Sequence, residues 1–232
     1  MRVLAVDTAT KSCSVAVVDG QTLLAEVIVI TGETHSKHLM NLIHQVLQIS
    51  RISLKDIEGF AVTRGPGSFT GLRIGISTVK GLAASSRKPI VGVSTLDALA
   101  NQAGVTPYLI CTVIDARKDE VYFARYRRVD GILIKEAEEL VLPVVNAIAD
   151  IREPCYFIGD GSLTYKPAIL ETLGENRMVC APRFHHTIRA ATVAKLGLER
   201  MRKNDVDDVS TFSPRYIRKS DAELNLAKRH RP

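Results

Sequence analysis

A glycine-rich stretch, residues 61–76, combines the residue types that most favour ligand chemistry in this chain. Gly65-Pro66-Gly67 follows a short apolar run, and Ser68 can cap the helix that begins after it. Free backbone N–H groups at such a helix start can hold a phosphate. A P-loop would end in Gly-Lys-Ser/Thr, and no lysine stands here. A tight turn with close helix packing is therefore favoured over direct phosphate binding.

The histidines and cysteines show no spacing that is typical of a metal site or a disulfide framework. A helical metal pair needs histidines four residues apart with a third ligand nearby, and the spacings here do not fit. We expect each histidine to lie at the surface or near a helix cap, without a metal: His35, His38, His44, His185, His186 and His230. The four cysteines are widely separated, which suggests neither a zinc site nor a disulfide framework. No serine, cysteine or histidine stands in a recognisable nucleophile motif.

The composition is that of an ordinary globular chain. It has 232 residues, is 46% hydrophobic and 24% charged, and carries a net charge of +6. This excludes a disordered chain and leaves room for one large or two small domains. Most of the excess charge lies in residues 214–232, where a solvated terminus is favoured over an RNA-binding segment. No apolar run reaches the ~20 residues that a membrane span needs, and Asp7 interrupts the apolar region that a secretory signal peptide would require. We therefore expect a cytoplasmic protein without membrane contact.

The same order of elements occurs twice. The first half predicts strands at 2–6, 13–18, 23–30, 59–63 and 89–93, with helices at 34–49, at 69–86 and from 94. The second half predicts strands at 109–114, 121–126, 132–140 and 155–158, with helices at 144–151 and 187–203. In both halves an Asp-Gly pair separates the second and third strands, which is a strong hairpin signal.

This order is similar to that of the ribonuclease-H-like half-domain. We predict an α/β fold of two such half-domains, as in the actin, Hsp70 and sugar-kinase superfamily, each a mixed sheet of the five-stranded type with flanking helices. The predicted divisions are 1–104 for the first half, 105–218 for the smaller second half, and 219–232 for a basic, disordered tail.

In that superfamily the aspartates that end the first strand of each half flank a nucleotide cleft. The matching residues are Asp7 and Asp115, with Thr8 and Thr10 after the first. Neither turn has a glycine to let its backbone approach a phosphate. The resemblance therefore implies a weak or vestigial nucleotide site at these four residues.

Five motifs extend the resemblance to one family. The chain resembles the TsaB (YeaZ) family in segments 4–10, 64–75, 92–96, 114–117 and 214–218. Members pair with a TsaD-type catalytic subunit to form threonylcarbamoyladenosine in tRNA. The resemblance implies the same partner, a TsaE-type ATPase in the assembled complex, tRNA contact through that complex, and a homodimer when the chain is alone.

The catalytic sister subunit carries a histidine pair that binds a metal. Aligned with this chain, the pair falls on Thr95 and Leu99, which cannot replace it. The resemblance thus implies a non-catalytic subunit with no tightly bound cofactor, while ATP and a divalent metal belong to the assembled complex. The alternative is a stand-alone enzyme, either an ATP-dependent phosphotransferase using the two aspartates or the metallopeptidase of older labels.

We expect the association surface on the helices at 34–49 and 69–86. Gly71 and Gly75 would let a partner helix approach closely, although packing within the chain alone is an open alternative. One surface would then serve both homodimer and heterodimer. The predicted interface residues are His38, Leu39, Leu42, Leu47, Phe69, Gly71, Leu72, Gly75 and Val79.

Overall fold

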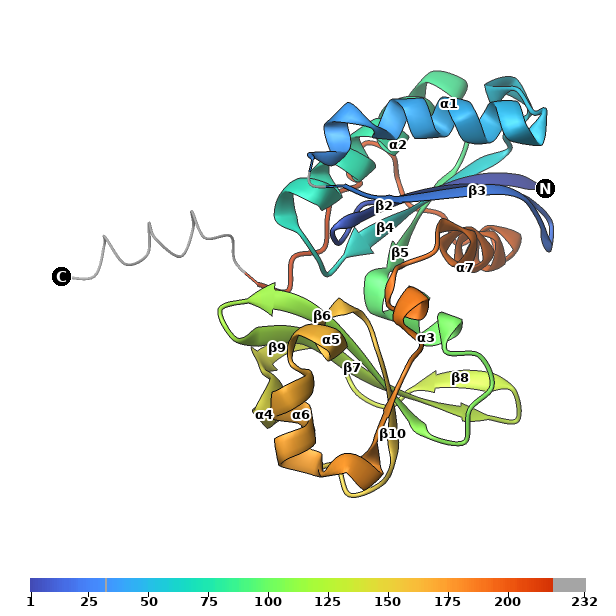
Figure 1. Ribbon diagram of the computed structural model, residues 1–232. Coiled ribbons are helices and arrows are strands. Elements are labelled where there is room, and N and C mark those ends of the chain that lie inside the picture. The colour runs from blue at the N-terminus through green and yellow to red at the C-terminus, as the bar shows by residue number, and fades with distance from the viewer. Residues whose placement is uncertain (32, 219–232) are drawn as a thin grey trace.

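The computed structural model describes residues 1–31 and 33–218, so the predicted tail, 219–232, lies outside the described residues. The chain forms two halves, each built on one mixed β-sheet, and Figure 1 shows them one above the other. The fold class agrees with the prediction.

The first sheet has the strand order β3-β2-β1-β4-β5. Its first three strands form an antiparallel meander, and β4 and β5 extend it in parallel. Gly20 takes the left-handed φ of +59° that the first hairpin turn needs. The strands are β1 (Arg2–Asp7), β2 (Ser12–Asp19), β3 (Thr22–Ile30), β4 (Gly59–Gly65) and β5 (Ile90–Ser94).

Helices cover both faces of the first sheet. α1 (Leu39–Ser50) and α2 (Phe69–Ser86) lie on one face, and α7 (Ala190–Arg202) lies on the other (Figure 1). The predicted cap is present, since the Ser68 hydroxyl accepts a hydrogen bond from the Gly71 amide at 3.3 Å. Two short 3-10 turns, His35–Lys37 and Leu54–Asp56, flank α1.

The second sheet has the order β11-β10-β6-β7-β8, and β9 also pairs with β7. The single strand predicted for 132–140 is wrong, because the chain breaks into two short strands that pair with different parts of β7. The strands are β6 (Leu109–Arg117), β7 (Glu120–Val129), β8 (Ile132–Lys135), β9 (Leu140–Pro143), β10 (Cys155–Ile158) and β11 (Met178–Cys180).

Three short helices pack on the second sheet: α4 (Val144–Ile148), α5 (Asp160–Thr164) and α6 (Lys166–Leu173). The prediction missed α5 and α6, which contain too few residues to show a periodic pattern. Two 3-10 turns, Glu175–Arg177 and Arg183–His186, complete this part.

One helix joins the halves. α3 (Thr95–Gln102) lies between the two sheets in Figure 1, and Leu96 and Leu99 belong to an apolar core that draws residues from both halves. The division at residue 104 separates the strands of the two sheets. The division does not hold for the later elements, because α7 and residues 207–216 pack on the first half. There Gly197 lies against Ala61, and Phe212 enters the core.

Candidate functional site

Asp7 ends β1 with its carboxyl sealed from solvent. One oxygen, Oδ1, accepts hydrogen bonds from the Thr63 hydroxyl at 2.8 Å and the Ala9 amide at 3.1 Å. The other oxygen, Oδ2, is buried without a hydrogen-bond partner. Burial raises the pKa of Asp7 to about 7, against the lowering effect of its two donors, and the Asp160 charge raises it slightly further. The folded chain therefore holds a carboxyl that is partly protonated near neutral pH.

The turn after Asp7 is packed against α2. The Thr8 hydroxyl donates to the Gly71 carbonyl at 2.7 Å, and the Thr8 side chain is completely buried. A Cβ at Gly71 would overlap the Thr8 carbonyl oxygen, and one at Gly75 would overlap the Thr8 hydroxyl. These two glycines thus serve packing within the chain, which was the open alternative, and the interpretation that they admit a partner's helix is wrong.

The glycine turn is packed in the same way. The Ser68 amide donates to the Ala9 carbonyl at 2.7 Å, and a Cβ at Gly67 would overlap that same carbonyl oxygen. Since the Gly71 amide is taken by the Ser68 hydroxyl, two of the N–H groups that would hold an anion are already used. This supports the tight-turn interpretation over phosphate binding.

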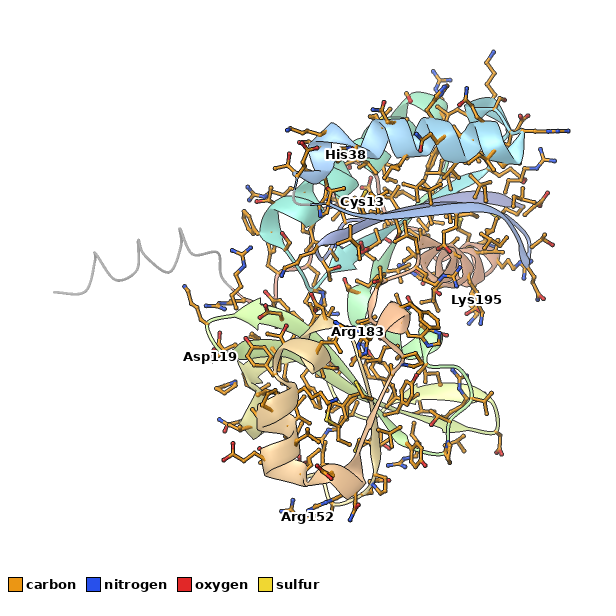
Figure 2. All side chains as sticks on the ribbon, in the orientation of Figure 1. Cys13, His38, Asp119, Arg152, Arg183 and Lys195 are labelled. Carbon is orange, nitrogen blue, oxygen red and sulfur yellow. The ribbon has the colours of Figure 1, made fainter. Side chains whose placement is uncertain are left out.

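Asp115, near the end of β6, is less enclosed. Its Oδ1 accepts from the Arg117 amide at 2.8 Å and from the Tyr165 hydroxyl at 3.0 Å, and the residue is half-buried. The turn after it, 117–119, is exposed and runs through three residues with positive φ. Asp119 in that turn lies at the outer edge of the second half (Figure 2).

Asp160, which is not among the predicted site residues, contacts Asp115 and interacts electrostatically with Asp7. Its Oδ1 accepts from the Asp115 amide at 3.1 Å. Burial raises the pKa of Asp160 above its ordinary value, and the Asp115 charge adds to that rise, whereas the nearby Lys11 opposes it. Its position two residues after the apolar strand at 155–158 was the signal available in the sequence.

The four predicted nucleotide-site residues are therefore not equivalent. The Thr8 hydroxyl is taken by Gly71, whereas the half-buried Thr10 shares a hydrogen bond with Ser12 at 3.0 Å. Asp7 and Asp115 each interact electrostatically with Asp160. The Thr8 hydroxyl and the Ala9 amide are engaged inside the chain.

Metal-binding residues do not converge in the part of the chain that the structure describes: no three His, Cys, Asp or Glu side chains there could hold an ion. Thr95 and Leu99 are both completely buried, and Leu99 is part of the core around α3. His186 ends the 3-10 turn Arg183–His186, near a cap as expected, but it does not lie at the surface. Its ring is buried, with Nδ1 at 2.8 Å from the Gly159 carbonyl and Nε2 at 2.9 Å from the Ala181 carbonyl.

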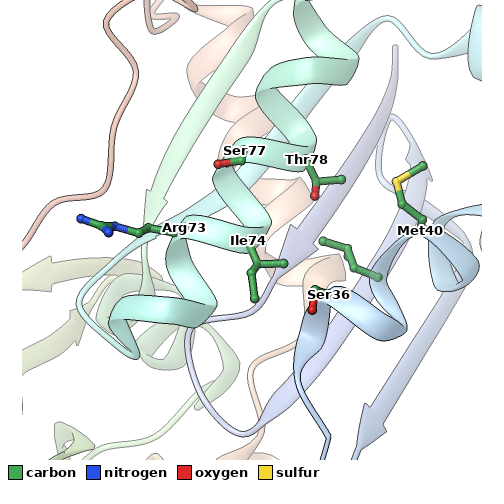
Figure 3. A pocket seen from close by; sticks show the side chains of 7 residues that line it. Ser36, Met40, Arg73, Ile74, Ser77 and Thr78 are labelled. Atoms are coloured by element: carbon green, nitrogen blue, oxygen red, sulfur yellow. The ribbon is translucent and has the colours of Figure 1, made fainter.

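A shallow hollow of about 330 Å³ lies between α1 and α2 on the outside of the first half. Figure 3 shows Met40 and Ser36 on one side of it, Ile74 and Thr78 on the other, and Arg73 pointing away. Met40 is 55% exposed, so much of its apolar side chain is open to solvent. This hollow therefore offers some apolar surface between the two helices to another molecule.

The predicted interface residues divide by burial. Leu42, Leu72 and Val79 lie in the chain's own core and cannot offer their side chains to a partner. Leu39 is almost completely buried too, but it lines the hollow. The half-buried ones are His38 at the start of α1 (Figure 2), Leu47, and Phe69. Helical periodicity alone did not separate the inward from the outward face, because α2 carries apolar residues on more than one side.

A two-sheet α/β fold with strand-ending aspartates and helices on the outer faces defines the class of ribonuclease-H-like, actin-like proteins. The fold of component A of (R)-2-hydroxyglutaryl-CoA dehydratase from Acidaminococcus fermentans agrees, with a TM-score of 0.54 at 10% identity over 87% of this chain and 99% of that one. No helix among the described residues is long and apolar enough to cross a membrane.

Within that class, the family model described as "TsaD: tRNA N6-adenosine threonylcarbamoyltransferase" matches residues 29–226. The tRNA threonylcarbamoyladenosine biosynthesis protein TsaB of Bacillus subtilis is 30% identical over 96% of both chains. The structure of YeaZ from Pseudomonas aeruginosa superposes with a TM-score of 0.77 at 25% identity, over 93% of this chain and 99% of that one. The chain belongs to the TsaB (YeaZ) family, whose members are named for tRNA threonylcarbamoyladenosine biosynthesis.

Proposed function

We propose that this chain is a non-catalytic partner subunit in tRNA threonylcarbamoyladenosine formation. It pairs with a TsaD-type catalytic subunit and holds it in working shape for threonylcarbamoyl transfer to N6 of adenosine 37 in tRNAs that read codons beginning with A. The observation that carries the proposal is the burial of Thr95 and Leu99, because the positions of the catalytic subunit's histidine pair here form part of a core.

The remaining components are assigned to the complex. ATP and a divalent metal act there with a TsaE-type ATPase subunit, and tRNA is reached through the assembly. The engaged Thr8 hydroxyl and the buried Asp7 carboxyl support this assignment, since neither is free to orient a nucleotide. The proposed location is the cytoplasm.

The proposed partner surface is the hollow between α1 and α2. Met40 and Ile74 give it apolar sides, and Ser36, Ser77 and Thr78 supply polar groups. Because a single patch can be covered by only one neighbour at a time, homodimer and heterodimer compete for it.

The test replaces Met40, which lines the hollow, with lysine. The matched control is Ile49→Lys on the same helix, since Ile49 is 65% exposed and lies about half a turn away around the helix axis. A buried charge without a partner is costly, so Met40→Lys should weaken binding to the catalytic subunit about tenfold or more, with Ile49→Lys near wild type. Light scattering, titration calorimetry and a tRNA modification assay measure the outcome.

Two results would contradict the proposal at different points. Wild-type affinity and modification with a folded Met40→Lys protein would move the surface elsewhere. Full tRNA modification by the remaining components without this chain would contradict the proposed role as a required subunit. Turnover of ATP by the purified chain, abolished in Asp7→Asn, would instead support the stand-alone enzyme.

A further inference from the structure

The C-terminal strap, residues 207–218, crosses from the first half to the second. It follows α7, begins where Asp207 pairs with Ile90 of β5, and ends beside the β6–β7 turn. Figure 1 shows this segment running down from the first sheet to the tip of β6.

The middle of the strap is anchored to the first half. Phe212 is buried in that core, and the Lys80 ammonium donates to its carbonyl at 3.0 Å. Further on, the Arg215 amide donates to the Arg64 carbonyl at 2.8 Å. These contacts are independent of the second half.

The end of the anchor is an aromatic stack on α2. The Tyr216 ring lies 4.6 Å from the Phe69 ring, centroid to centroid, with 25° between their planes. The Tyr216 hydroxyl accepts from Arg73 Nε at 3.0 Å, and the Arg73 guanidinium lies 3.8 Å above the Phe69 ring. The backbone between Phe212 and Tyr216 is therefore held at both ends by the first half.

Two arginines project from this anchored strap to the second half. Arg218 donates to the Ala116 carbonyl at 2.9 Å and pairs with Glu120 at 3.0 Å. Ala116 directly follows Asp115, so this contact holds the turn beside the Asp115 and Asp160 carboxyls. Arg218 is only 17% exposed, which makes its ion pair less screened than a surface pair.

The second arginine forms a longer ion pair with the second half. Arg215 lies 3.6 Å from Glu139 Oε2, too far for a hydrogen bond, and 4.0 Å from Glu138 Oε2. The Glu139 side chain is completely buried, and its Oε2 has no donor, whereas its other oxygen accepts from Lys135 at 2.9 Å and from Ser94. A buried carboxylate oxygen without a donor favours any motion that supplies one.

We propose that the strap is a latch between the halves. Arg218 holds the β6–β7 turn and Arg215 holds the segment at Glu139, so that the strap ties the second half to the first in the present arrangement. The latch thereby sets how far the Asp115 and Asp160 carboxyls are exposed. This inference uses contacts within one chain and does not depend on the proposed function.

Hydrogen exchange of the full chain, followed by mass spectrometry, tests the latch. In Arg218→Gln, exchange of amides 116–121 should rise on the order of tenfold, and Arg215→Gln should raise exchange around 138–140. Residues 209–214 should keep their protection, since Phe212 still anchors them. Arg202→Gln, an exposed arginine at the end of α7, is the matched control and should change none of these segments.

Glu120→Gln removes the same ion pair from the opposite side and should reproduce the effect on 116–121. Unchanged exchange there in both folded variants would overturn the latch. An equal rise in 209–214 would overturn it too, because the arginines would then only keep the strap folded.

Discussion

Asp7 and Asp115 end the equivalent first strands of the two halves, yet their surroundings differ. Asp7 is completely buried with one oxygen left without a donor, and burial raises its pKa to about 7. Asp115 is half-buried and is held by the Tyr165 hydroxyl and a backbone amide. Two positions that look alike in sequence therefore carry different electrostatics.

The cause lies in the helix that follows the neighbouring parallel strand. In the first half this helix is α2, with 18 residues, and its glycines let it close over the turn after Asp7. In the second half the corresponding helix is α5, with 5 residues, which covers Asp115 only in part. Coverage by a neighbouring element, rather than the strand that carries the aspartate, decides the environment of its carboxyl.

The largest expected effect on stability comes from disrupting the packing of α2 against the turn after Asp7. Gly71→Ala places a Cβ against the backbone oxygen of Thr8 and should cost about 3 kcal/mol or more of unfolding free energy. Gly81→Ala in the same helix meets no atom within 4 Å and should stabilise by about 0.5–1 kcal/mol. Urea denaturation measures both, and similar midpoints for the two variants would refute the close packing.

The second largest effect is the pH dependence of stability that follows from the raised pKa of Asp7. Because the folded carboxyl holds its proton up to about pH 7 and the unfolded one only to about 3.8, stability falls as pH rises between these values. Between pH 5 and 8 this loss should be about 2 to 3 kcal/mol. Asp7→Asn should remove that slope, whereas Asp115→Asn, in which Asp7 is intact, should keep it. Parallel pH profiles for wild type and Asp7→Asn would contradict the burial argument.

The smallest expected effect on stability comes from removing the hydroxyl donors, Thr63 for Asp7 and Tyr165 for Asp115. Thr63→Val removes a buried donor to Asp7 and should cost about 2 kcal/mol at pH 8, where the carboxyl is ionised. Tyr165→Phe removes a donor to the half-buried Asp115, which water can replace, and should cost about 1 kcal/mol or less. Equal costs in denaturant titrations would mean that the two sites do not differ in burial.

Local sequence signals predicted much of the fold. The Asp-Gly hairpins, the strand at 155–158 and the helix at 69–86 lie where apolar spacing and turn residues placed them. The prediction failed where elements are short, as at 132–140 and in α5 and α6, because a few residues carry no periodicity.

The candidate site was predicted only in part. Asp7 and Asp115 were chosen because each ends an apolar strand at the position that the superfamily resemblance marks, and in the structure each interacts electrostatically with Asp160. Asp160 itself and the engaged state of Thr8 depend on contacts between segments far apart in the chain. Nothing local distinguishes a hydroxyl that faces solvent from one bonded to a distant carbonyl.

The sequence by itself determined most of the longer strands and helices, the glycine turn and the family, since each follows from neighbouring residues or from motifs in their linear order. Only the tertiary structure decided that Gly71 and Gly75 pack inward, that α7 returns to the first sheet, and that Asp7 is sealed from water. The physical reason is that burial is a property of how elements pack, and a residue's free energy of desolvation is set by what covers it.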